Sequence, residues 1–147
     1  MFKDLYLVIK NKVIAIPLIL ILFFNFLGLT FSFYKVFFWY YIVLHFFGGA
    51  WVALLVIYWP KFKNQFNTLS QKLVFILLMV MIIGIAWEIM EIFADGILDL
   101  KFYANSGFAR ELRAGYTRDT FLDLVMDFLG GLSIGYLFMK RKLEISG

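Results

Sequence analysis

Four long apolar stretches divide the chain, at residues 13–33, 36–59, 73–94 and 119–139. Each is long enough to cross a bilayer, because a hydrocarbon core of about 30 Å needs about 20 helical residues. All four are predicted to be helices, since lipid offers no hydrogen-bond partner to an open backbone. The pattern therefore predicts an all-α polytopic membrane protein, with one integral membrane domain over residues 1–147 built as a bundle of four transmembrane helices.

Composition supports this class. Hydrophobic residues make up 63% of the chain, whereas an ordinary soluble domain is about 45–50% apolar. There are no cysteines, which excludes disulfides and thiolate metal sites. The net charge of +4 comes from basic residues between the apolar stretches, where they orient helices. The charge therefore does not indicate a nucleic-acid partner, and the lipid bilayer is the expected surrounding.

The basic residues also predict the topology. Nine of the 14 basic residues precede the first span, separate the second from the third, or follow the fourth: Lys3, Lys10, Lys12, Lys61, Lys63, Lys72, Lys140, Arg141 and Lys142. With four spans these three groups fall on one side of the membrane. The opposite side has the short turn at Lys35 and a loop of mixed charge over residues 95–118. Because cytoplasmic loops are enriched in lysine and arginine, both termini are predicted to be cytoplasmic, in a multi-pass protein of the cell (inner) membrane.

Ionisable residues within the spans are the strongest functional signal. They are His45 in the second span, Glu88, Glu91 and Asp95 at the end of the third, and Asp119, Asp123 and Asp127 at the start of the fourth. A charged group in a bilayer costs about 2.5–3.5 kcal/mol on insertion scales, so it usually has a partner and a role. At about 1.5 Å per residue, His45 and Asp127 both lie about 12–14 Å below the outer boundary. We therefore expect these groups to converge.

Their angular spacing predicts a metal site. At about 100° per residue, the acids of the third span fall within about 60° of arc and those of the fourth within about 80°. Carboxylate oxygens with an imidazole suit divalent Mg, Mn, Zn or Fe, and helical bundles supply such ligands from facing helices. The predicted cofactor is one of these ions, and its predicted ligands are His45, Glu88, Glu91, Asp123 and Asp127.

A metal in this position favours chemistry on a membrane-borne substrate, such as a lipid or polyprenyl phosphate. Glu91 or Asp119 is then the predicted general base, with water as the attacking group. Arg118 is the predicted phosphate-binding residue, because guanidinium pairs bidentately with phosphate. Structural alternatives exist for two of these residues. Asp119 can cap the fourth span, where Thr120-x-x-Asp123 has the form of a capping box, and Arg118 can anchor that span at the interface.

Two other classes of function use the same residues. In a proton- or divalent-cation-coupled transporter, the carboxylates bind and release the ion during alternating access. In a non-catalytic membrane subunit, metal or ion pairs hold the helices together. The inner halves of the spans contain no acid or base that would continue an ion path, which favours an enzyme over a transporter.

A resemblance agrees with this picture. The residues that carry it are His45-x-x-Gly48-Gly49, Trp87-Glu88-x-x-Glu91 and Asp119-Thr120-x-x-Asp123-Leu124-x-x-Asp127-x-x-Gly130. Over residues 40–136 the chain resembles the YjdF and VanZ-like groups of small polytopic bacterial membrane proteins. The resemblance implies a helical membrane protein with a histidine span, a Trp-Glu span and a late Asp-Thr span. It carries no biochemical activity.

Overall fold

The computed structural model describes residues 10–31, 33–37, 39–60, 62, 66, 68–98 and 114–146, with side chains described except at 34, 35, 94–98, 114–119, 139 and 141–146. The helices are α2 (Lys12–Thr30), α3 (Phe33–Val36), α4 (Tyr40–Tyr58), α5 (Leu69–Leu98) and α6 (Ala114–Ser146). Within the described residues, four of them are long and apolar enough to cross a membrane, over Lys12–Thr30, Tyr40–Tyr58, Leu69–Phe93 and Thr120–Phe138. The prediction of four membrane-crossing helices is confirmed in length and composition.

Two helices begin earlier than the apolar pattern predicted. The third predicted span starts at residue 73, but α5 starts at Leu69, because Thr68 and Gln71 form a reciprocal cap. Thr68 N donates to Gln71 Oε1 at 3.3 Å, and Gln71 N donates to Thr68 Oγ1 at 3.2 Å, the capping-box arrangement. At the other end of the fold, α6 already begins at Ala114. Asp119 therefore lies inside the helix, and the alternative in which it caps the fourth span is wrong.

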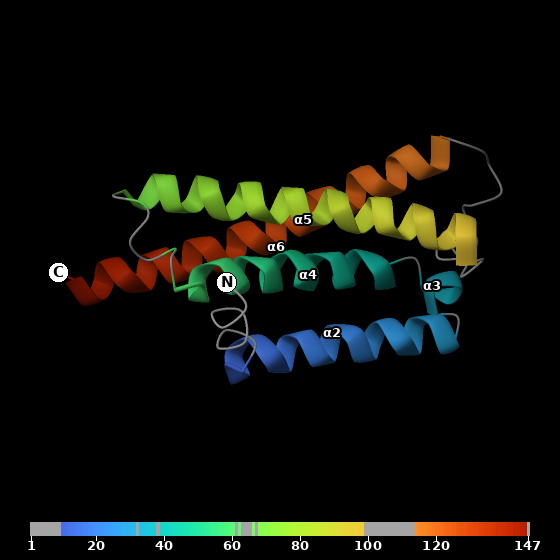
Figure 1. Ribbon diagram of the computed structural model, residues 1–147, viewed down its shortest axis with the longest axis horizontal. Coiled ribbons are helices and arrows are strands. Elements are labelled where there is room, and N and C mark those ends of the chain that lie inside the picture. The colour runs from blue at the N-terminus through green and yellow to red at the C-terminus, as the bar shows by residue number, and fades with distance from the viewer. Residues whose placement is uncertain are drawn as a thin grey trace.

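Helix α2 lies on one side of α4, and α6 and α5 lie on the other, with α6 next to α4 (Figure 1). The connection after α4 returns the chain to the start of α5, so α4 and α6 run in the direction opposite to α2 and α5. Helix α3 lies at the end of the bundle where α5 ends and α6 begins, here called the α3 end. The opposite end, which contains the start of α2 and the end of α6, is the C-terminal end.

The closest packing in the bundle is between α4 and α6. A Cβ added to Gly49 would collide with the main-chain carbonyl of Asp127, and one added to Gly130 would collide with the main-chain carbonyl of Phe46. Only glycine at both positions allows the two backbones to approach this closely. Small residues are the usual means of helix association in lipid, where apolar side chains gain little by leaving one apolar medium for another.

The apolar core is concentrated toward the C-terminal end. It consists of Val52, Ala53, Val56, Ile57, Phe62, Ile76 and Val80, all buried. The half of the bundle nearer the α3 end contains buried polar residues instead, namely Glu88, Asp123 and Asp127. The bundle thus divides into an apolar half and a half that holds the candidate site.

Candidate functional site

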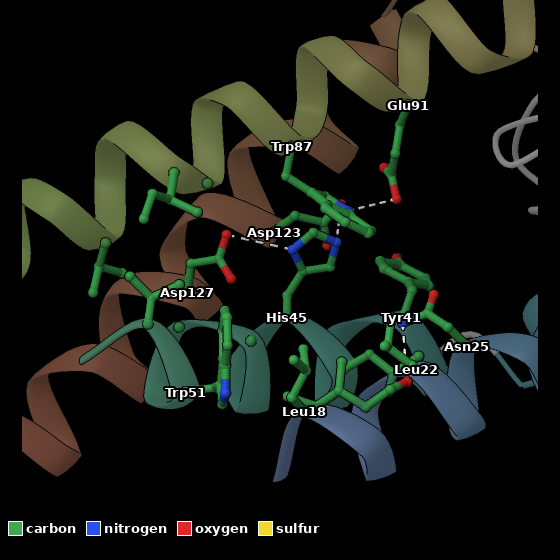
Figure 2. A pocket seen from close by; sticks show the side chains of 18 residues that line it. Leu18, Leu22, Asn25, Tyr41, His45, Trp51, Trp87, Glu91, Asp123 and Asp127 are labelled. Atoms are coloured by element: carbon green, nitrogen blue, oxygen red, sulfur yellow. Dashed lines mark hydrogen bonds and ion pairs between the residues drawn. The ribbon is translucent and has the colours of Figure 1, made fainter. Parts of the chain in front are cut away.

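His45 occupies the centre of the polar half of the bundle. Its side chain on α4 is only 10% exposed. Nδ1 lies 3.4 Å from Asp127 Oδ2, while Nε2 lies 3.9 Å from Glu88 Oε1 and 3.8 Å from Asp123 Oδ2. Figure 2 shows the ring with Asp127 on one side and Asp123 on the other. The two ring nitrogens thus face different carboxylates, drawn from two different helices.

The acids around His45 are held by helix geometry and by close packing. Asp123 and Asp127 are four residues apart on α6, so they lie one above the other on one face of the helix. They are 3% and 5% exposed, and Glu88 on α5 is 3% exposed. Gly84 makes room for Asp127, because a Cβ there would lie 2.7 Å from Asp127 Oδ2. The structure brings His45 together with these three acids, as predicted.

Thr120 fixes the orientation of the Glu88 carboxylate. Its hydroxyl donates a 2.8 Å hydrogen bond to Glu88 Oε2, which leaves Oε1 as the oxygen that faces His45 Nε2. The sequence pattern predicted a capping box of Thr120 with Asp123. The early start of α6 removes that role, and the hydroxyl instead joins α6 to α5.

Glu91 lies apart from this group. Its Oε1 accepts a 2.8 Å hydrogen bond from Trp87 Nε1, and both residues line the cavity described below. Figure 2 shows Glu91 one turn farther along α5, with its carboxylate directed toward the indole of Trp87. Three of the five predicted ligands therefore have donor atoms that lie together, Asp127 contacts the other imidazole nitrogen, and Glu91 occupies a separate position on the wall of the cavity.

The remaining predicted residues lie at the start of α6. Asp119 and Arg118 belong to the helix through their backbone, but their side chains lie outside the described residues, as does that of Asp95 on α5. Their positions immediately before Thr120, which reaches Glu88, put them at the α3 end of the site.

Three donor atoms in the site lie close enough together to be candidate ligands of a divalent metal ion. Among the described residues, His45, Glu88 and Asp123 each offer a ligand atom, and these three atoms lie within 4.8 Å of one another. Two ligands on opposite sides of a metal stand about 4.2 Å apart when each bond is about 2.1 Å long. The two distances from Nε2, 3.8 and 3.9 Å, are within that span. Imidazole and carboxylate are donors shared by Zn, Fe and Mn sites.

A cavity of about 170 Å³ lies beside the imidazole. The acidic wall comes from Glu91, Asp123 and Asp127, and the facing wall comes from α2, which contributes Leu18, Ile21, Leu22 and Asn25. The α2 wall was not predicted, because ionisable groups mark a site within an apolar span and α2 has none along this wall. The available signal was Asn25, an amide inside an otherwise apolar stretch, whose Nδ2 donates to Ile21 O at 3.3 Å.

Comparison with known proteins identifies the family. Residues 7–143 match the family described as "Predicted membrane protein (DUF2238)". The chain belongs to this family. No match was found among curated proteins or among solved structures. Together with the four candidate spans, membership of this family establishes a multi-pass integral membrane protein in contact with lipid.

Proposed function

We propose that this member of the family binds a divalent metal ion and uses it on a membrane-borne phosphate compound. His45 Nε2, Glu88 and Asp123 are the proposed ligands, and the ion is one of Mg, Mn, Zn and Fe. The observation that carries the proposal is that the two ring nitrogens of His45 contact different carboxylates: Nδ1 faces Asp127, and Nε2 faces Glu88 and Asp123. Metal-binding histidines commonly donate their other ring N–H to a carboxylate, which sets the tautomer and the ring orientation.

Electrostatics also supports a cation. Glu88, Asp123 and Asp127 are buried around one imidazole. Buried carboxylates that share one site repel one another unless a cation or protons lie among them. In this proposal Asp127 is a positioning residue for His45 rather than a ligand, which revises its predicted role. When bound, a divalent ion supplies Lewis acidity toward a phosphoryl oxygen and toward water.

The protein's own groups then take the remaining roles. Glu91 is the proposed general base, because it lies on the cavity wall near the ligands and is oriented by the indole of Trp87. Asp119 is a second candidate base and Arg118 a candidate phosphate-binding residue, both at the α3 end of the site. The lysine-rich C-terminal end is the proposed cytoplasmic side of the cell membrane, and the likeness to the YjdF and VanZ-like groups agrees with a small polytopic protein of this kind.

Elemental analysis of the protein purified in detergent tests the proposal. Wild type should hold close to one equivalent of a divalent metal, and His45→Ala should hold almost none. Asp99→Asn is the control. Asp99 comes directly after the last residue of α5 in the sequence, and this substitution removes one carboxylate that is outside the proposed ligand set. Wild-type protein that holds no metal, and gains no thermal stability from Mg²⁺, Mn²⁺, Zn²⁺ or Fe²⁺, would overturn the metal site, because a bound ligand must stabilise the folded state.

A further inference from the structure

The cavity beside His45 changes in polarity along its length. At the α3 end it is lined by Asn25, Tyr41 and Glu91, and toward the C-terminal end by Leu18, Val52 and Val80 among others. Leu18 and Asn25 are two turns apart on α2, a rise of about 10 Å. A membrane amphiphile with its head toward the α3 end would therefore meet polar groups at the head and apolar groups along the chain.

Helix α2 forms one wall of this cavity without closing its side. Among the described residues, α2 packs against α4 and α3 and makes at most slight contact with α5 or α6. Among the contacts described, hydrogen bonds attach it to α4 near both ends of the segment that lines the cavity. Trp51 Nε1 donates to Ile14 O at 2.9 Å, and the Tyr40 hydroxyl donates to Phe24 O at 2.6 Å.

The cavity therefore opens laterally, between α2 and α5. Two residues that line it stay exposed, Leu22 on α2 at 54% and Trp87 on α5 at 37%. Figure 2 shows Trp87 next to the imidazole and Leu22 on the α2 side of His45. The volume of about 170 Å³ is similar to cavities of roughly 150 Å³ that bind one ring-sized apolar molecule. A lipid chain cannot fit entirely within it, so the rest of the chain must extend through the opening.

We propose that this cavity binds a single-chain phosphate amphiphile from the bilayer, which enters between Leu22 and Trp87 with its head beside Asn25 and His45. The apolar segment next to the head lies against Leu18 and Val52, and the remainder of the chain stays in lipid. The inference rests on the proposed function for the choice of a phosphate head, because the acidic wall attracts phosphate only through a metal ion. The position of the chain depends on the cavity alone.

Photolabelling tests this proposal. The full-length protein is placed in phosphatidylcholine vesicles with Mn²⁺ and a lysophosphatidic acid whose acyl chain carries a diazirine, and labelled peptides are identified by mass spectrometry. We expect saturable labelling of residues 18–25 and of the Trp87 segment. Unlabelled lysophosphatidic acid should compete at about tenfold lower concentration than lysophosphatidylcholine of the same chain length, a difference of about 1.4 kcal/mol.

A matched pair of variants on α2 separates the cavity from ordinary lipid contact. Leu18→Trp fills the cavity and should abolish the saturable component. Ile19→Trp makes the same substitution at the next residue, which is 63% exposed and does not line the cavity, and should leave it intact. Asn25→Leu should weaken the preference for the phosphate head, which depends mainly on the metal ion, while retaining chain labelling. The midpoint of thermal unfolding in detergent serves as the measure of folding for each variant.

The outcomes separate the two proposals. Metal-loaded protein labelled evenly over its exposed helix faces, or equally in Leu18→Trp and Ile19→Trp, would overturn the cavity proposal and leave the metal site standing. Saturable labelling that Leu18→Trp removes, in a protein that holds no metal, would support the cavity and overturn the metal assignment.

Discussion

Asp127 Oδ2 lies 3.4 Å from Nδ1 of His45, on the side of the imidazole away from Glu88 and Asp123. With the proton on Nδ1, the ring donates to Asp127 and directs the lone pair of Nε2 toward the other two carboxylates. With a metal ion on Nε2, Asp127 on α6 would thereby set the tautomer of His45 on α4. The carboxylate of Asp127 fits there because Gly84 on α5 lacks a side chain.

This geometry predicts different effects for two aspartates on one helix face. Asp123→Asn removes a proposed ligand and should abolish metal binding. Asp127→Asn removes only the partner of Nδ1, and such changes typically weaken metal affinity by about 10–100-fold. Isothermal titration calorimetry, with the metal ion added to metal-free protein, measures the metal affinity of both variants. Equal losses in the two variants would contradict separate roles for Asp123 and Asp127.

Glu91 should be required for turnover and not for metal binding. Glu91→Gln is expected to lower the rate of phosphate release from a lysophosphatidic acid by about 10²–10⁴-fold, the usual contribution of a general base, while metal content stays at the wild-type level. Trp87→Phe removes the indole N–H that orients the carboxylate and should produce a smaller loss of rate. Loss of metal from Glu91→Gln would instead identify Glu91 as a ligand.

Close packing of α4 against α6 should make glycine indispensable at their contact. Gly130→Ala places a methyl group against the Phe46 carbonyl, and overpacking of this kind typically costs about 1–3 kcal/mol. The midpoint of thermal unfolding in detergent should fall in this variant. Ser133→Ala is the control on the same helix, because Ser133 is exposed and bonds only to Leu129 O of its own helix among the contacts described. An unchanged midpoint for Gly130→Ala would argue against this helix contact.

Topology is predicted by the basic residues. Reporter fusions after Gly147 and within residues 105–107 should report opposite sides of the membrane, with the C-terminus in the cytoplasm. The four spans and the enrichment of lysine on one side lead to this result. Fusions that report the same side would remove the four-span arrangement and, with it, the antiparallel pairing of α5 with α6.

Ion transport is not expected. The described part of the bundle toward the C-terminal end is packed with apolar side chains, including Ala53, Ile57, Ile76 and Val80, and an ion path needs polar groups or water at that depth. Protein reconstituted in vesicles should show no proton or divalent-ion flux above empty vesicles under an imposed gradient. A flux that disappears in Asp127→Asn would make the protein a transporter.

The number of spans and the identity of most site residues could be predicted from the sequence. Span length and hydropathy are local properties, and a carboxylate or imidazole in an apolar stretch is visible without knowledge of its neighbours. His45 and Asp127 could be brought to one depth from helix rise and an antiparallel order alone. The start of α5 was also encoded locally, in Thr68-x-x-Gln71, although hydropathy placed it four residues too late.

The tertiary structure decided which groups meet. Whether Asp127 faces Nδ1 or Nε2, and whether Glu91 joins the ligands or pairs with Trp87, depends on the rotation of each helix about its axis and on the distance between helices. Those quantities result from side-chain packing at Gly49, Gly84 and Gly130 and cannot be read from the period of one helix. The α2 wall could not be predicted for the same reason. A single amide such as Asn25 indicates a cavity-lining residue only when the position of its helix relative to His45 is known.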